Sequence, residues 1–190
     1  MKKRLQTQVQ NKSDILYTPK SIAIKMIDMC DLHPNQIVLD PSRGGGVFYN
    51  NFPDNVKKEW CEIAEGKNFF DCMNKYDWVI GNPPYSMWDK WLEHTMAITE
   101  NFCYIFGFMN FTPTRIHKIQ EKGFVLTKLH LVKVDWWMSQ SIICVFQKKC
   151  NKEIIFSVEE KTVQCHCGRR CGRGRNGRSY NECVTLQYHF

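Results

Sequence analysis

The chain has 190 residues, of which 43% are hydrophobic and 24% charged, and its formal net charge is +7. This length allows one domain with a substantial core and excludes two full domains. No apolar run approaches the roughly 20 residues that a membrane-spanning helix needs, which excludes an integral membrane protein. The positive charge favours a polyanionic partner.

Residues 1–16 predict a flexible N-terminus and an intracellular protein. They are polar, and they lack the apolar core of a secretory signal. We therefore expect a cytoplasmic protein, or a nuclear one in a eukaryotic or viral host, with no membrane association. Six of the ten cysteines follow no pattern and are interpreted as neutral thiols: Cys30, Cys61, Cys72, Cys103, Cys144 and Cys150.

Residues 18–30 predict a well-buried helix, because their apolar side chains cover more than one helix face. Thr18 is a good N-cap, and Pro19 is favoured at the first helical position. Ile37-Val38-Leu39-Asp40 then predicts a short buried strand.

A glycine-rich loop, Pro41-Ser42-Arg43-Gly44-Gly45-Gly46, follows this strand directly. Consecutive glycines let a bulky ligand approach the main chain closely. With Asp40 at the strand end, the loop suits a nucleoside ligand, and residues 47–49 predict the start of a short helix. A simple flexible turn is the alternative interpretation.

Residues 56–63 predict a second strand, which ends near Glu62. The five residues between Glu62 and Asn68 are too few for another helix and strand. Residues 78–81 then predict a buried strand that leads into Asn82-Pro83-Pro84-Tyr85. The two prolines hold Asn82 stiffly at the carboxyl end of the strand, where ligands bind in open α/β sheets. A proline strand terminator with a surface Tyr is the alternative.

The second half of the chain predicts two helices and three strands. In the helix 86–100, Trp88 and Trp91 are interpreted as core packing and His94 as solvated. A strand at 102–109 precedes a helix that Thr112-Pro113 opens and that continues to 121. The strands 124–134 and 142–147 flank a hairpin-like link. This order indicates an α/β sheet that is mostly parallel with an antiparallel edge hairpin.

Three motifs, taken together, resemble the N6-adenine class of S-adenosylmethionine-dependent methyltransferases. They are Tyr17-Thr18-Pro19, the stretch from Asp40 to Phe48, and Asn82-Pro83-Pro84-Tyr85. The resemblance implies a catalytic domain over 17–150 with a Rossmann-like methyltransferase sheet, trimmed between Glu62 and Asn68, where the family usually has a helix and a strand. It also implies methyl transfer from S-adenosylmethionine to the N6 amine of adenine in DNA.

The resemblance further implies a role for each motif residue. The side-chain oxygen of Asn82 and the main-chain oxygen of Pro83 would accept the two N–H bonds of the amine, and Tyr85 would stack on the base beside Pro84. Asn68 departs from the Asp usual at its position, but an amide oxygen can still accept a hydrogen bond. The methionine portion of the cofactor would contact Tyr17, Thr18, Pro19, Asp40, Pro41, Gly44 and Gly46. Its ribose would contact Glu62, and its adenine would contact Asn68 and Phe69.

Two aromatic residues, Trp136 and Trp137, are candidates for the opposite face of the target base. Packing within the hairpin is the alternative interpretation for both residues.

Residues 151–190 predict a basic, cysteine-rich extension. Its cysteines suggest a structural zinc site, although their irregular spacing leaves a reduced, disordered tail as the alternative: Cys165, Cys167, Cys171 and Cys183. Its arginines suit phosphate backbones and predict a nucleic-acid partner, DNA before RNA: Arg169, Arg170, Arg173, Arg175 and Arg178.

Two further functions stay open beside DNA adenine methylation. Similar Asn-Pro-Pro-Tyr motifs occur in methyltransferases of RNA adenine and of protein glutamine. A catalytically weak relative could also bind nucleic acid through the C-terminal arginines. Those arginines favour nucleic acid over protein glutamine, but they do not separate DNA from RNA.

Overall fold

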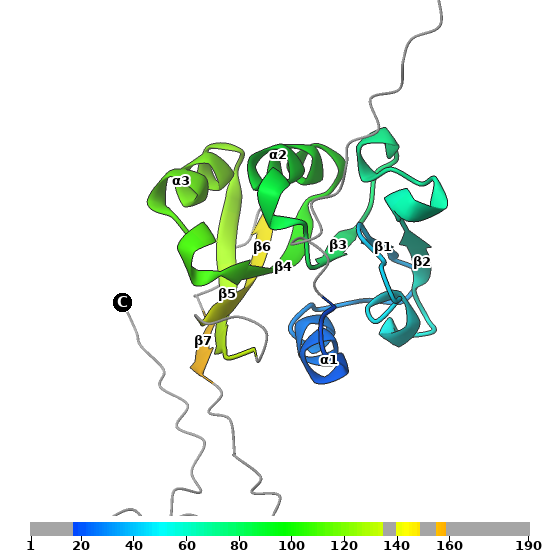
Figure 1. The fold of residues 1–190 in the computed structure, drawn as a ribbon, viewed down its shortest axis with the longest axis horizontal. Coiled ribbons are helices and arrows are strands. Elements are labelled where there is room, and N and C mark those ends of the chain that lie inside the picture. Colours follow the sequence, from blue (N-terminus) through cyan, green and yellow to red (C-terminus); the bar gives the residue numbers. More distant parts are fainter. Residues whose placement is uncertain (1–16, 135–139, 149–154, 159–190) are drawn as a thin grey trace, which may run out of the picture.

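Seven strands form one mixed sheet among the residues that the computed structural model describes, which are 17–134, 140–148 and 155–158 (Figure 1). Four parallel strands, β1 to β4, form one side of the sheet, and β6 pairs antiparallel with both β4 and β5. The spatial order is β2-β1-β3-β4-β6-β5-β7. The bounds are β1 Ile37–Asp40, β2 Lys57–Trp60, β3 Trp78–Gly81, β4 Asn101–Gly107, β5 Phe124–Val132, β6 Ser141–Lys148 and β7 Ile155–Val158.

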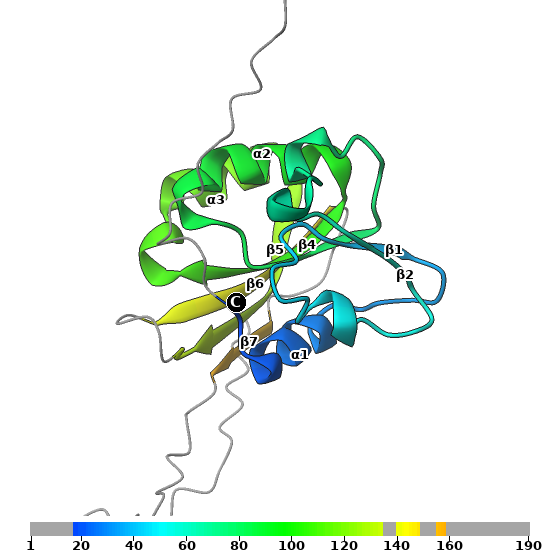
Figure 2. The same ribbon diagram turned by 45° about the vertical axis from the view of Figure 1, so that its right-hand side comes forward.

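Helices cover both faces of this sheet. Helix α1 (Lys20–Asp28) lies on one face, and α2 (Trp88–Ile98) and α3 (Pro113–Glu121) lie side by side on the other (Figures 1 and 2). Each face has its own buried apolar cluster, one around Met26 and one around Trp88. Within the described ranges, five single-turn 3-10 helices lie in the connections: η2 Tyr49–Asn51, η3 Ile63–Glu65, η4 Phe69–Asp71, η5 Tyr85–Met87 and η6 Phe108–Asn110.

The predicted fold class is confirmed, including the antiparallel edge and the trimmed segment. Between β2 and β3 the chain forms only η3 and η4, and every residue of that segment is described. Strand β7 was not predicted; it pairs in parallel with β5 and lies within the range assigned to the C-terminal extension.

Some predicted element ends are wrong. Pro19, and not Thr18, is the N-cap of α1, because its backbone is still extended at ψ 145°. The Pro19 carbonyl accepts hydrogen bonds from the Ile22 and Ala23 amides at 3.1 and 3.0 Å. Strand β2 covers only residues 57–60 of the predicted 56–63. By contrast, Thr112 caps α3 as predicted, accepting from the Arg115 amide at 3.4 Å.

The connections of the parallel strands place a ligand site between β1 and β3. From β1 the chain continues to β2 on one side, and from β3 it continues to β4 on the other, so neighbouring connections diverge between these two strands. In open α/β sheets, ligands bind outside the carboxyl ends of the strands at such a point. No helix within the described ranges has the length and apolar character needed to cross a bilayer.

Candidate functional site

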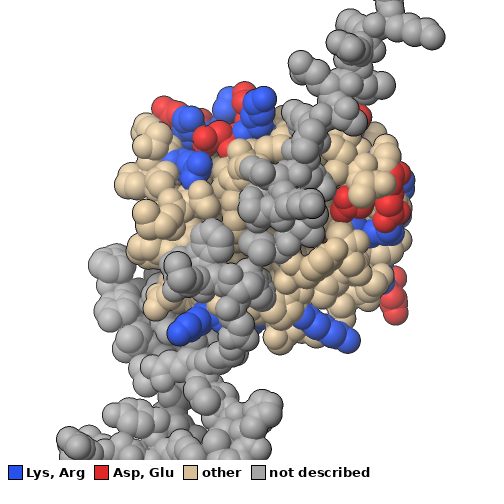
Figure 3. All heavy atoms as spheres, viewed as in Figure 1, with Lys and Arg blue, Asp and Glu red and all other residues tan. Residues whose placement is uncertain are grey.

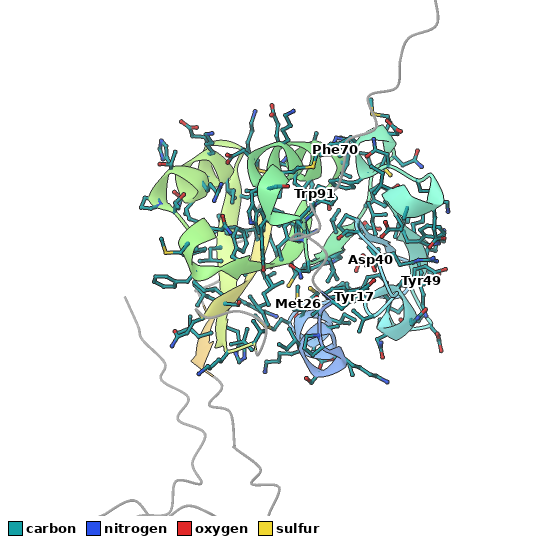
Figure 4. The ribbon with its side chains drawn as sticks, viewed as in Figure 1. Tyr17, Met26, Asp40, Tyr49, Phe70 and Trp91 are labelled. Atoms are coloured by element: carbon teal, nitrogen blue, oxygen red, sulfur yellow. The ribbon has the colours of Figure 1, made fainter. Side chains whose placement is uncertain are left out.

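A cavity of about 1020 Å³ opens at the carboxyl ends of β1 and β3. Its wall is formed by the glycine loop, the segment after β2, the Asn82–Tyr85 motif and the start of α2, with Arg115 reaching in from α3. Figure 4 shows Asp40 at the end of β1, with Tyr17 between it and α1, and Phe70 close to Trp91 of α2. The cavity therefore joins segments that are far apart in the sequence.

Asp40 is buried beneath the glycine loop. Its Oδ1 accepts a hydrogen bond from the Ser42 amide at 3.3 Å, and its Oδ2 accepts one from the Tyr49 amide at 3.2 Å. Burial raises the pKa of the carboxyl to about 7, against the opposite effect of these two hydrogen bonds. Asp40 is not among the described residues that line the cavity, so it holds the loop in place from behind.

The glycine loop depends on two positive φ angles, +49° at Gly44 and +80° at Gly46, which L side chains rarely adopt. The Gly44 amide donates to Glu62 Oε2 at 2.8 Å. The Tyr17 ring lies over the loop, 3.6 Å from the position that a Cβ would take at Gly44 or Gly45. The loop is thus fixed by Asp40 below and by Glu62 at its side.

Glu62 joins the glycine loop to the segment after β2. Its second carboxylate oxygen, Oε1, accepts from the Ala64 amide at 3.1 Å. Ile63, the next residue, is 39% exposed and lines the cavity. A carboxylate oxygen has two lone pairs, so each can still accept a hydrogen bond from a ligand hydroxyl.

Two neighbouring phenylalanines at this end of the cavity differ in burial. Phe69 is 2% exposed and stacks on Trp91 at 4.4 Å between ring centroids, whereas Phe70 is half-buried. Asn68 caps η4, its Oδ1 accepting from the Phe70 amide at 3.2 Å. Phe70 therefore offers more ring surface to a ligand than Phe69 does.

Two thiols enclose this segment. Cys61 Sγ and Cys72 Sγ are 2.8 Å apart and share a hydrogen bond. Burial, and then the Cys72 thiol, raise the pKa of the Cys61 thiol. The Cys61 backbone also bonds to both ends of the β1 turn, donating to Asp40 O and accepting from the Arg43 amide. The thiol contact and the two backbone bonds together hold the segment 61–72, which contains Glu62 and Asn68, against β1.

The Asn82 motif packs directly on the turn after β1. Ser42 Oγ donates to the Asn82 carbonyl at 3.1 Å, and the side-chain oxygen of Asn82 is buried. Tyr85 begins η5 and stacks on Trp88 at 6.1 Å, and Trp88 in turn stacks on Phe106 at 4.4 Å. Burial raises the pKa of Tyr85 to about 12, so its phenol stays neutral at physiological pH.

Gly81 permits this close packing, because a Cβ there would lie 2.9 Å from Pro41 Cδ. We expect Gly81→Ala to lower the free energy of unfolding by about 1–3 kcal/mol, since the β1–β3 contact must shift. Urea denaturation measures this change. Gly45→Ala is the matched control, because its Cβ would meet Tyr17 at an ordinary 3.6 Å. Equal stabilities of the two variants would contradict this packing argument.

The cavity brings together ten of the fourteen predicted site residues that the structure describes: Tyr17, Thr18, Pro41, Gly44, Glu62, Asn68, Phe69, Asn82, Pro84 and Tyr85. Pro19, Asp40, Gly46 and Pro83 are described but are not among the residues that line it. The other predicted residues lie outside the described part of the chain: Trp136, Trp137, Arg169, Arg170, Arg173, Arg175, Arg178, Cys165, Cys167, Cys171 and Cys183. The zinc prediction therefore stays a prediction, and the described residues contain no group of three or more metal-binding side chains.

Sequence reasoning missed Ile63, Phe70 and Arg115 as lining residues. Ile63 could have been found from its place beside Glu62, whereas nothing in the sequence pattern singled out Arg115. The prediction that His94 is solvated is wrong. Its ring is half-buried and packs edge-on against Phe69, with 4.7 Å between ring centroids.

Comparison with known proteins shows likeness at the level of the fold. No protein-family model matches the chain, and no curated protein sequence matches it. Among solved structures, a type I restriction-modification methyltransferase subunit from Streptococcus thermophilus superposes with a TM-score of 0.59 at 13% identity, over 75% of this chain and 47% of that one. This chain thus spans about half the length of that subunit.

Two further structures share the same fold. A precorrin-6y C5,15-methyltransferase from Geobacter metallireducens has a TM-score of 0.56 at 12% identity, over 70% of this chain and 91% of that one. The 23S rRNA methyltransferase ErmE has a TM-score of 0.54 at 13% identity, over 70% of this chain and 69% of that one. The chain therefore has the Rossmann-like methyltransferase fold.

Proposed function

We propose that this protein transfers a methyl group from S-adenosylmethionine to the N6 amine of adenine in DNA. The observation that supports it best is a single cavity in which the Asn82 motif faces the glycine loop and Glu62. A donor molecule held by the loop and a planar amine held by Asn82 would share this space. The structural neighbours include a restriction-modification methyltransferase subunit, which is consistent with a DNA substrate.

The residues present fit S-adenosylmethionine. The cavity of about 1020 Å³ is at the upper end of the range for ligand pockets, which leaves room for a target base beside the cofactor. Glu62 would accept from the ribose hydroxyls, and Ile63 and Phe70 would pack against the adenine. Glycines at positions 44 and 45 leave the loop open to the methionine portion. When bound, the cofactor supplies a methyl group activated by a sulfonium centre.

The Asn82 motif would hold and orient the amine. The side-chain oxygen of Asn82 and the main-chain oxygen of Pro83 each accept one N–H bond, which draws the amine lone pair out of conjugation with the ring. The strand end and the Ser42 hydrogen bond fix Asn82, so the orientation is prepared before the substrate binds. Tyr85, backed by Trp88, offers a ring on which the base stacks.

We expect cofactor affinity to increase with pH because of Asp40. Its pKa of about 7 means that acidification protonates the carboxyl, weakening its bonds to the Ser42 and Tyr49 amides and its attraction for the cofactor ammonium. If only the ionised form supports binding, affinity increases about tenfold between about pH 6 and pH 8. Isothermal titration calorimetry at constant ionic strength measures this, and Asp40→Asn should remove the dependence. A wild-type affinity that is flat or falls with pH would show that Asp40 does not control the loop.

Transfer of an isotope-labelled methyl group tests the proposal as a whole. The full chain is incubated with labelled S-adenosylmethionine and, separately, with mixed-sequence DNA, RNA of the same sequence and a glutamine-containing protein. We expect label in DNA. Label in RNA or protein alone would contradict the proposed substrate, and label in none of them would contradict the proposed activity.

A further inference from the structure

The surface beside the cavity, formed by η6 and the start of α3, exposes two large apolar side chains. Phe108 is 55% exposed and Met109 is 74% exposed. Both follow β4 directly, so they lie at the same edge of the sheet as the carboxyl ends of β1 and β3. The Phe108 amide donates to the Gln140 carbonyl at 3.0 Å, which holds η6 in place. These side chains are thus presented to solvent on a fixed turn.

Arg115 links this turn to the cavity. Its Nη1 donates to the Asn110 carbonyl at 3.1 Å and to Asn110 Oδ1 at 2.9 Å, and its Nε donates to Asp89 Oδ1 at 3.1 Å. The guanidinium is therefore held between α2, α3 and η6 while it lines the cavity. A guanidinium that is already oriented loses little further freedom when it binds a phosphate.

Charge is distributed unevenly around the cavity. At the end formed by η3 the lining carries Glu62 and Glu65 with Arg43 paired to Glu65, which leaves one net negative charge. At the end formed by α2 and α3 it carries Lys90 and Arg115 with Asp89 paired to Arg115, which leaves one net positive charge. Figure 3 shows basic and acidic side chains intermixed over α2 and α3, and a mainly acidic group at the β2 side of the molecule. The hydrogen bond from Arg115, and then the charges of Arg115 and Lys118, lower the pKa of Asp89, so Asp89 stays ionised beside Arg115. An anion therefore binds more favourably at the α2–α3 end.

We propose that Phe108, Met109 and Arg115 form a strand-contact surface that binds the DNA nucleotides flanking the target base. The inference rests on the proposed function for the position of that base. Arg115 would contact a backbone phosphate, and Phe108 would stack on a neighbouring base with Met109 packed beside it. An aromatic ring next to a fixed cation is the combination that binds single-stranded nucleic acid. The surface thus accounts for two exposed apolar side chains beside the cavity.

Binding of a fluorescently labelled single-stranded DNA oligonucleotide tests this surface in the full chain. We expect Phe108→Ala to weaken binding by roughly 5- to 150-fold, the range that loss of one base–aromatic stack produces. We expect Arg115→Gln to reduce the slope of log affinity against log salt concentration by about 0.7, the value for one single-strand phosphate contact. Fluorescence anisotropy at several salt concentrations gives both values.

Matched controls separate this surface from general effects. Met73→Ala removes another apolar side chain, 81% exposed, from the segment before β3, and Lys122→Gln removes one charge from the far end of α3. Neither control should change binding by more than about twofold. The inference is overturned if Phe108→Ala and Arg115→Gln behave like their controls, or if both affect only an RNA oligonucleotide of the same sequence. If the wild-type chain transfers no methyl group but the two substitutions still weaken its binding to DNA, the result supports the surface and contradicts only the proposed activity.

Discussion

Replacing Asn82 with alanine is expected to reduce methyl transfer by roughly a thousandfold, the cost of removing one acceptor or donor aimed at the reacting group. The variant loses the buried side-chain oxygen that would accept an amine N–H bond. It keeps the Ser42 hydrogen bond, because that bond is made to the Asn82 main-chain carbonyl. The strand end should therefore keep its shape, and cofactor affinity should stay within about twofold of wild type.

Single-turnover kinetics together with calorimetry separate these two effects. Asn82→Asp retains an oxygen acceptor and should preserve part of the activity, whereas Asn74→Ala, an exposed amide before β3, should preserve all of it. An Asn82→Ala variant that loses cofactor binding in proportion to its activity would mean that Asn82 holds the donor and not the acceptor.

Replacing Glu62 with alanine should produce the largest loss of cofactor affinity, by about 100-fold or more. The carboxylate accepts from the Gly44 and Ala64 amides, and in the proposed complex also from the ribose. Hydrogen bonds to a charged group contribute about 1.5–3 kcal/mol each. Losing the two bonds that Glu62 would accept from the ribose hydroxyls therefore predicts a loss of affinity of at least this size. Calorimetry with S-adenosylmethionine measures it directly.

Glu65 provides the matched control for Glu62. It lies three residues further along, also lines the cavity and pairs with Arg43 at the rim. Because this pair is partly exposed, Glu65→Gln should change affinity by less than about fivefold. Equal losses from Glu62→Ala and Glu65→Gln would indicate a general charge effect and would contradict a specific role for the Glu62 carboxylate.

The elements around the site were predictable from the sequence because they combine local signals. The run Trp78-Val79-Ile80-Gly81 is apolar and ends at a glycine, and it forms β3 with those same bounds. The short spacing from Glu62 to Asn68 predicted a trimmed sheet, and only η3 and η4 form there. In both cases chain length and side-chain type decide the structure within a few residues.

Contacts that depend on strand register or on side-chain direction could not be predicted. The Glu62–Gly44 hydrogen bond follows from the pairing of Asp40 with Trp60 across β1 and β2. The sequence Phe69-Phe70 does not reveal which ring enters the core, and Trp91 on α2 decides it. Arg115 faces the cavity because Asp89 and Asn110 hold it there, and both partners lie outside its own helix.

The position of the methyl group in the product tests the account most directly. DNA treated with the full chain and S-adenosylmethionine is digested to nucleosides and analysed by mass spectrometry, with the Asn82→Ala variant treated in parallel. The account predicts N6-methyladenine from the wild-type chain and only a trace from the variant. A methyl group on another base or another ring position, or equal product from both proteins, would contradict the proposal that Asn82 holds the N6 amine.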